Sequence, residues 1–280
     1  MTQMSPLVST EWLAQNIWRP DVVIADASWY LPQAGRKARE EYEGGHIPGA
    51  VFFDIDAISD QKTDLPHMLP DPVAFASSVR KLGIGDSDLV IFYDGAGIYS
   101  APRALWMMRA MGHNKTAVLD GGLPKWRKEG RAIETTTETT VGRSHFAPRL
   151  QPEMIRDFDA MRSNLESRAA QIVDARSPAR FNAQEPEPRP GVRGGHMPGA
   201  LNVHYRKLIA DNGTLKPPEE LRAAFAAADL NQPIVTSCGS GLTAAILLLA
   251  LDEIGARNVA LYDGSWTEWG ARAEAPVVTS

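Results

Sequence analysis

The stretch that decides the fold is Pro233-Ile234-Val235-Thr236-Ser237-Cys238-Gly239-Ser240-Gly241-Leu242-Thr243, which runs into Ala244-Ala245-Ile246-Leu247-Leu248-Leu249. A short β-branched run ends at the only cysteine of the chain, and an apolar segment rich in helix formers begins after two glycines and a serine. The pattern predicts a buried strand, a tight loop and a helix. The N–H groups of such a loop gather at the start of the helix, where they favour an anion such as a thiolate. Cys238 is therefore a candidate nucleophile, although many lone cysteines are only small buried hydrophobes.

The composition limits the classes of protein to consider. A chain of 280 residues can bury one large core or two moderate ones. Its net charge of -5 and the absence of a basic run argue against nucleic acid or an anionic membrane as partners. A single cysteine excludes an internal disulfide and fits a reducing compartment. The first residues do not resemble a signal peptide, and the apolar run at 244–251 is too short to span a bilayer. We expect a soluble, cytoplasmic protein.

The chain repeats itself once. Four segments recur in the same order at nearly one offset, which indicates a duplicated domain rather than a short-period solenoid. The pairs are 24–28 with 172–176, 45–50 with 195–200, 90–95 with 234–239, and 119–122 plus Trp126 with 262–265 plus Trp269. The second pair reads Gly-His-Ile-Pro-Gly-Ala in the first half and Gly-His-Met-Pro-Gly-Ala in the second. Each half has about 130 residues, an ordinary domain size.

Short apolar runs alternate with helical stretches within each half. In the first half we expect strands at 22–25, 89–92 and 117–119 and helices at 75–82 and 101–111, with another helix opening at Ser9. This alternation predicts parallel strands with crossover helices on both faces. Ligands of such sheets bind at the carboxyl ends of the strands, where Cys238 is expected. A polar run without periodicity predicts a linker at 135–145 between domains at 1–134 and 146–280.

These motifs resemble the rhodanese family of sulfurtransferases over nearly the whole chain. The His-Ile-Pro-Gly-Ala segments, the repeated Asp-Gly-Gly/Ser…Trp segments and a cysteine loop in the second half alone carry the resemblance. It implies an α/β fold of two tandem rhodanese-like domains, each a central, mainly parallel sheet flanked by helices. It also implies a catalytic cysteine that carries sulfur as a persulfide, without a cofactor. The first half has Asp94 in place of Cys238, and a carboxylate cannot accept a sulfur atom, so we expect that half to be non-catalytic.

The loop composition bears on the sulfur donor. Thiosulfate-specific rhodaneses place basic residues after the cysteine, whereas Gly239 and Ser240 are neutral, and Cys-Gly-Ser-Gly-Leu-Thr resembles the loop of 3-mercaptopyruvate sulfurtransferases. A phosphatase on this fold would need an arginine six residues after the cysteine, where this chain has Ala244. The resemblance implies sulfur transfer from 3-mercaptopyruvate to a thiol or cyanide, with release of pyruvate. A thiosulfate sulfurtransferase and a non-catalytic persulfide carrier or regulatory module stay open as alternatives.

A donor with a carboxylate and a ketone needs hydrogen-bond donors held in a fork. Arg180 and Arg189 match the family's substrate-binding arginines, although each could otherwise be a solvated surface charge. Prolines on both sides of Arg189 stiffen its backbone. We expect the loop amides to stabilise the persulfide; the residues are Gly239, Ser240, Gly241, Leu242 and Thr243.

Proton transfer needs further groups, because attack on the donor sulfur expels an enolate. Ser240 lies two residues after the nucleophile, and the family pattern also offers Asp56 and His67 from the first half. Together they would form a Ser-His-Asp relay, whereas the alternative is that Asp56 and His67 only cap loops. The expected acceptor is a thiol such as thioredoxin or a small dithiol.

Other histidines and tryptophans favour structural roles. His46 and His196 recur in both halves, including the half without a nucleophile, which indicates a turn rather than catalysis. Trp126, Trp266 and Trp269 are expected to pack in the core. No Cys/His cluster has the spacing of metal ligands, so we predict no metal.

Overall fold

The computed structural model describes residues 5–135, 142 and 144–279. The chain forms two compact units. The N-terminal unit runs to Gln61, continues over Leu69–Gln151 and includes Ala210–Leu215. The C-terminal unit consists of Lys62–Met68, Pro152–Ile209 and the residues from Lys216 onward. Each unit therefore contains a short segment from the other half of the sequence.

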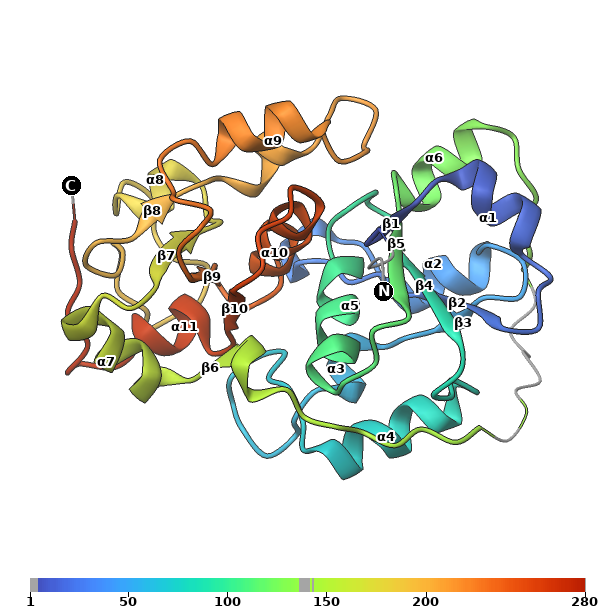
Figure 1. Cartoon of the computed structure of the whole chain (residues 1–280), viewed down its shortest axis with the longest axis horizontal. Helices are drawn as coiled ribbons and strands as arrows, with labels where there is room; N and C mark the ends of the chain where they lie inside the picture. The colour runs from blue at the N-terminus through green and yellow to red at the C-terminus, as the bar shows by residue number, and fades with distance from the viewer. Residues whose placement is uncertain (1–4, 136–141, 143, 280) are drawn as a thin grey trace. The chain divides into compact units, whose positions relative to one another are not determined.

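The N-terminal unit is built on a five-stranded parallel sheet in the order β1-β5-β4-β2-β3. Its strands are β1 (Leu7–Val8), β2 (Val22–Asp26), β3 (Val51–Phe52), β4 (Leu89–Tyr93) and β5 (Thr116–Leu119). Figure 1 shows α1 (Thr10–Asn16), α2 (Ala38–Gly44) and α6 (Gly122–Lys128) on one face. The other face carries α3 (Ile55–Ile58), α4 (Pro72–Lys81) and α5 (Ala101–Ala110). Leu13, Tyr42 and Trp126 pack against the sheet on the first face.

The C-terminal unit repeats this sheet strand by strand, in the order β6-β10-β9-β7-β8, and all its strand pairs are parallel. The strands are β6 (Ile155–Arg156), β7 (Gln171–Asp174), β8 (Leu201–Asn202), β9 (Ile234–Ser237) and β10 (Val259–Tyr262). The helices are α7 (Phe158–Ser167), α8 (Pro178–Phe181), α9 (Pro218–Ala224), α10 (Ala244–Glu253) and α11 (Ser265–Trp269). The identical strand order confirms the predicted α/β fold.

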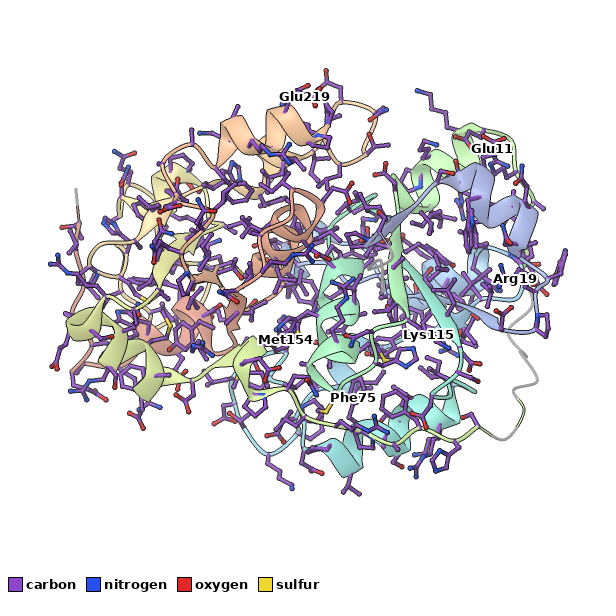
Figure 2. The ribbon with its side chains drawn as sticks, viewed as in Figure 1. Glu11, Arg19, Phe75, Lys115, Met154 and Glu219 are labelled. Carbon is purple, nitrogen blue, oxygen red and sulfur yellow. The ribbon has the colours of Figure 1, made fainter. Side chains whose placement is uncertain are left out.

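Local sequence explains several element boundaries. The Ser9 side chain accepts a hydrogen bond from Trp12 N (3.0 Å) and so caps α1. Asp71 caps α4 in the same way, with Pro72 at its first position. Residues 244–251 of α10 are all buried, which explains why this helix is apolar on every side. Figure 2 shows the contrast with exposed side chains such as Glu11 and Glu219, while Phe75 on α4 is fully buried.

The predicted linker at 135–145 falls partly outside the described residues, which omit 136–141 and 143. The chain directly after it packs on the N-terminal unit. Phe146 is fully buried, and its carbonyl accepts a hydrogen bond from Arg80 Nη2 (2.6 Å). The ring centroids of Phe146 and Phe75 lie 5.9 Å apart. The compact N-terminal unit thus extends to Gln151, because an aromatic side chain of this segment completes its core.

The helices of both units are short. None of those in the described ranges is long and apolar enough to cross a membrane.

Candidate active site

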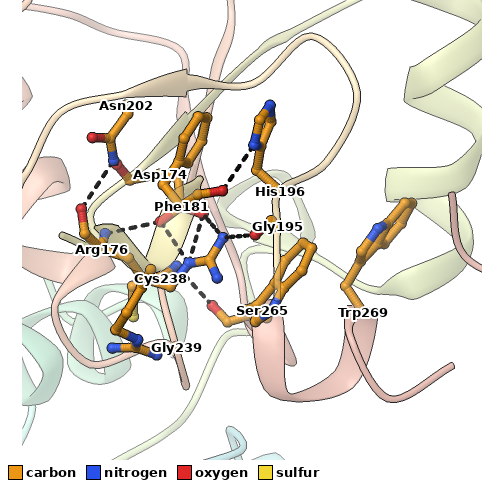
Figure 3. A network of polar contacts seen from close by, with 12 residues as sticks. Asp174, Arg176, Phe181, Gly195, His196, Asn202, Cys238, Gly239, Ser265 and Trp269 are labelled. Carbon is orange, nitrogen blue, oxygen red and sulfur yellow. Dashed lines mark hydrogen bonds and ion pairs between the residues drawn. The ribbon is translucent and has the colours of Figure 1, made fainter. Parts of the chain in front are cut away.

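Cys238 lies where the sequence predicts it, between the end of β9 and the start of α10. It is 1% exposed. Its N–H donates to Ser265 Oγ (3.2 Å), and its carbonyl accepts from Trp266 N (2.9 Å) (Figure 3). The first two residues of α11 therefore form hydrogen bonds with both backbone polar groups of Cys238. Gly241 has φ +77°, a conformation that favours glycine, and this permits the tight loop.

The equivalent loop of the N-terminal unit shows what its backbone binds. One oxygen of the Asp94 carboxylate accepts from the N–H groups of Tyr99 (2.8 Å), Ser100 (2.9 Å) and Ala101 (2.9 Å). The other oxygen accepts from Ala96 N (2.9 Å). Four amides thus converge on one anionic side chain at the start of α5. We call this arrangement the amide cradle; it is a backbone anion site built by a loop that leads into a helix.

The loop of Cys238 carries the sequence counterparts of these four amides. Ser240, Thr243 and Ala244 are the counterparts of Ala96, Tyr99 and Ser100, at the offset of 144 that relates Asp94 to Cys238. Within the described residues, their N–H groups donate to no other protein group. The fourth counterpart, Ala245, donates to Leu242 O (3.2 Å). Three of the four N–H groups whose counterparts hold the Asp94 carboxylate therefore have no protein acceptor among the described residues of the C-terminal unit.

Arg180, one of the two predicted donor-binding residues, lies against the cysteine loop. It is the third residue of α8, whose N-cap is Ser177. A Cβ at position 239 would lie 3.1 Å from Arg180 Nη2, so the glycine makes room for the guanidinium. Arg180 Nη2 donates to Glu187 Oε2, whereas its buried Nε has no partner among the described residues. The guanidinium thus keeps hydrogen-bond donors for a bound anion.

Arg189, the second predicted residue, reaches the same loop through Thr267. Its Nη1 donates to Thr267 Oγ1 (3.3 Å). The Thr267 hydroxyl and N–H both donate to Gly239 O, at 2.6 and 2.8 Å. Of the two arginines that the motifs single out, Arg180 therefore lies against Gly239 itself, and Arg189 is linked to Gly239 through Thr267.

Arg176 forms a buried charge network beneath the loop that sequence reasoning missed. Its Nε and Nη2 donate to the Asp174 carboxylate at 3.1, 3.0 and 2.7 Å, and Nη2 also donates to Gly195 O (2.7 Å) (Figure 3). Its Nη1 donates to Glu187 Oε1 (2.7 Å), and its guanidinium lies 4.2 Å from the ring centroid of Trp266. Burial opposes the charge, but the Asp174 and Glu187 carboxylates outweigh it and raise the pKa of Arg176.

Two sequence signals could have pointed to this network. The first is that Arg176 stands where the otherwise similar first-half segment has Ser28. The second is the acidic residue beside Arg189. Glu187 lies in a proline-rich run that is typical of an exposed loop, and only its contacts reveal that its side chain is 4% exposed.

The predicted relay residues fall in different units. Ser240 is in the cysteine loop and 8% exposed. His67 is buried, has φ +63°, and belongs to the segment Lys62–Met68 of the C-terminal unit, like Cys238. Asp56 lies on α3 of the N-terminal unit, where its exposed carboxylate accepts a hydrogen bond from Trp29 Nε1 (2.8 Å).

An insertion marks His67 in the sequence. The offset between the halves is 150 at Leu65 and Leu215 but 146 at Pro72 and Pro218, the first residues of α4 and α9. The first half is therefore four residues longer in the stretch that contains His67.

His46 and His196 have the same structural environment. Each stacks on an aromatic ring, Tyr42 at 4.0 Å and Phe181 at 3.8 Å between centroids, and its Nδ1 bonds to the carbonyl of that aromatic residue. Trp126, Trp266 and Trp269 are buried in the cores. These contacts fit packing and turn formation.

Comparison with known proteins identifies the family of this chain. A model of the rhodanese-like domain matches residues 9–129 and 157–272. This chain belongs to the rhodanese family. The two matched ranges confirm the predicted tandem of rhodanese-like domains, with Asp94 in the first and Cys238 in the second.

Several known proteins match over nearly the full length of this chain. The 3-mercaptopyruvate sulfurtransferase of Escherichia coli strain K12 is 46% identical, over 96% of each chain. Thiosulfate/3-mercaptopyruvate sulfurtransferase 1 of Arabidopsis thaliana, a mitochondrial protein, is 43% identical over 97% of this chain and 78% of its own. The crystal structure of SseA from Escherichia coli superposes with a TM-score of 0.85 and 42% identity, over 94% of this chain and 99% of that chain.

Proposed function

We propose that this rhodanese family member transfers sulfur from 3-mercaptopyruvate to a thiol or cyanide through a persulfide on Cys238. The observation that carries the proposal is the amide cradle. In the first domain it binds the Asp94 carboxylate, and three of the four corresponding N–H groups in the loop of Cys238 donate to no protein group within the described residues. The names of the Escherichia coli and Arabidopsis relatives support 3-mercaptopyruvate as the donor.

The chemistry balances without an added oxidant or reductant. The Cys238 thiolate attacks the donor sulfur, an S–S bond forms, and the donor's C–S bond breaks. The electron pair of that bond leaves as the pyruvate enolate, whose carbon takes up a proton while the donor thiol loses one. The products are pyruvate and a Cys238 persulfide. The amides of Ser240, Thr243 and Ala244 stabilise the negative charge on the outer sulfur, as their counterparts do for Asp94.

The donor's carboxylate and ketone are bound by Arg180, which lies against Gly239, and by Arg189, which is linked to Gly239 through Thr267. The loop itself, from Gly239 through Ser240, Gly241 and Leu242 to Thr243, carries no charged side chain. A thiosulfate dianion therefore finds less positive charge at the nucleophile than a site with basic loop residues would offer.

Proton transfer is assigned to Ser240 with His67 and Asp56. Segment Lys62–Met68 belongs to the unit of Cys238, which supports His67 as the partner of Ser240. The reciprocal segment, Ala210–Leu215, lies at the corresponding loop of the N-terminal unit. Leu215 N donates to Asp120 Oδ1 (2.8 Å), and a Cβ on Gly97 would lie 3.3 Å from Gly213 O. This internal correspondence supports a position of the segment with His67 near the loop of Cys238.

The second substrate is a thiol acceptor, such as thioredoxin or a small dithiol, or cyanide. A thiolate nucleophile and a dithiol acceptor both need a reducing environment, so we place the reaction in the cytoplasm. The proposed reaction uses no cofactor and no metal.

The intact mass of the protein tests the proposal directly. Brief exposure to 3-mercaptopyruvate should add the mass of one sulfur atom and release one pyruvate per protein, and the Cys238→Ser variant should do neither. A higher kcat/KM with thiosulfate than with 3-mercaptopyruvate would favour the thiosulfate sulfurtransferase. Sulfur uptake from a partner protein without any pyruvate would favour the carrier function.

The relay has a separate test. His67→Gln should lower kcat for 3-mercaptopyruvate on the order of 10²-fold and flatten the pH profile of kcat, because a general acid–base group is lost. Alkylation of Cys238 by iodoacetamide, which needs no relay, should keep its rate. A variant with the wild-type pH profile would show that His67 only shapes its loop.

A further inference from the structure

The side chain of Glu187 is buried between two arginines. Its Oε1 accepts from Arg176 Nη1 (2.7 Å), and its Oε2 accepts from Arg180 Nη2. The Glu187 side chain is 4% exposed, compared with 1% for Arg176 and 24% for Arg180. A carboxylate rarely leaves water to this extent unless it is paired, so the two arginines account for its burial.

The two arginines differ in how firmly they are held. Arg176 is fixed by both oxygens of Asp174, by Gly195 O and by the ring of Trp266. Arg180 has only Glu187 as a side-chain partner within the described residues, through a single nitrogen. Arg176 therefore anchors Glu187, and Glu187 in turn determines where the guanidinium of Arg180 points.

The direction of Arg180 matters because its guanidinium lies against the cysteine loop. Its Nη2 is 3.1 Å from the Cβ position of Gly239, and its Nε is buried without a partner in the described part of the chain. A long, flexible side chain that keeps free donors beside a nucleophile must be oriented in advance to bind a substrate carboxylate productively.

We infer that Glu187 is a positioning residue, which orients Arg180 toward the sulfur donor while Arg176 holds Glu187 in place. The inference rests on the proposed function for the identity of the donor. The charges of Asp174, Arg176, Glu187 and Arg180 cancel, so the network can stay buried, and Glu187 acts on the donor through Arg180 alone.

The first domain offers a matched control. Arg36 Nη2 donates to Gly95 O (3.1 Å), in the loop of Asp94, and its Nε and Nη2 donate to Glu41 at 2.9 and 2.5 Å. Glu41→Gln therefore weakens an Arg–Glu pair beside a loop that has no nucleophile. This variant should leave the kinetics of sulfur transfer unchanged.

A double-mutant cycle tests the inference. Glu187→Gln should raise KM for 3-mercaptopyruvate roughly tenfold with kcat within about twofold, because the amide cannot accept the charge-assisted hydrogen bonds of both arginines. Arg180→Ala should raise KM by roughly 10- to 150-fold. In the Arg180→Ala background, Glu187→Gln should have no further effect. Glu187→Asp, which keeps the charge beside Arg176 but is one methylene shorter, should change KM in the same direction.

Two outcomes would overturn the inference. The first is a wild-type KM in Glu187→Gln. The second is an effect of equal size with and without Arg180, which would mean that Glu187 only supports the fold. A wild-type protein that releases no pyruvate would instead contradict the proposed function. In that case, the same variants are compared by the rate at which iodoacetate alkylates Cys238, because we expect Arg180 to bind the carboxylate of this reagent. Iodoacetamide has no carboxylate and serves as the control. Its alkylation rate should be the same in all variants.

Discussion

At the scale of single residues, Asp26 and Asp174 show how one neighbour changes a buried carboxylate. Asp26 is the last residue of β2, and Asp174 is the last residue of the equivalent strand β7. Each carboxylate accepts a hydrogen bond from the backbone N–H of the residue two positions later, Ser28 at 2.9 Å and Arg176 at 2.8 Å. Asp174 also has the Arg176 guanidinium. Among the described residues Asp26 has no such cation, and burial raises its pKa to about 6.

This difference predicts the pH dependence of stability. Because the pKa of Asp26 is higher in the folded than in the unfolded protein, its stabilising effect is full below about pH 4 and is lost as the pH rises through 6. Asp26→Asn removes this titration. The free energy of unfolding of the variant minus that of the wild type should therefore increase by roughly 2–3 kcal/mol from pH 4 to pH 7. Urea unfolding at several pH values measures it; a constant difference over this range would contradict it.

At the scale of elements, the loops β4–α5 and β9–α10 have the same backbone plan with opposite consequences. In the first, Asp94 supplies an internal anion for four N–H groups, so the loop is complete without a ligand. In the second, three of the four equivalent amides donate to no protein group within the described residues, and the fourth, Ala245 N, donates to Leu242 O. We therefore expect the first loop to contribute to stability, and we propose that the second contributes to catalysis.

Asp94→Ala should therefore destabilise the first domain. Four buried or half-buried N–H groups lose their acceptor, which should cost on the order of 2–4 kcal/mol of unfolding free energy. Asp94→Asn keeps an acceptor oxygen and should cost less. Chemical denaturation measures both variants. A neutral Asp94→Ala would mean that water replaces the carboxylate without loss.

At the scale of the whole molecule, the two halves share one fold and differ at one loop, which carries Asp94 in the first half and Cys238 in the second. The two sheets share one strand order, and each compact unit includes a short segment from the other half of the sequence. The unit of Cys238 thereby includes His67, which lies in a stretch where the first half is four residues longer.

Amide hydrogen exchange should respond to the reaction in the loop of Cys238 and not in the loop of Asp94. Formation of the Cys238 persulfide should slow exchange of the amides of Ser240, Thr243 and Ala244, because each gains an acceptor. The amides that bind Asp94 should be protected before and after the reaction. Peptide-level exchange with and without 3-mercaptopyruvate tests this. Equal exchange of 239–245 in both states would show that the cradle does not hold the outer sulfur.

The sequence by itself determined the duplication, the alternation of strands and helices, and the strand–loop–helix around Cys238, because periodicity and turn residues report local burial and backbone conformation. Motif resemblance singled out Arg180, whose guanidinium lies against Gly239, and Arg189, which donates to Thr267, and their roles in donor binding stay predictions. Only the tertiary structure decided that Glu187 is buried between Arg176 and Arg180 and that His67 belongs to the same compact unit as Cys238. Ion pairing and the path of a loop depend on groups brought together by the fold, and neither leaves a periodic signal in the chain.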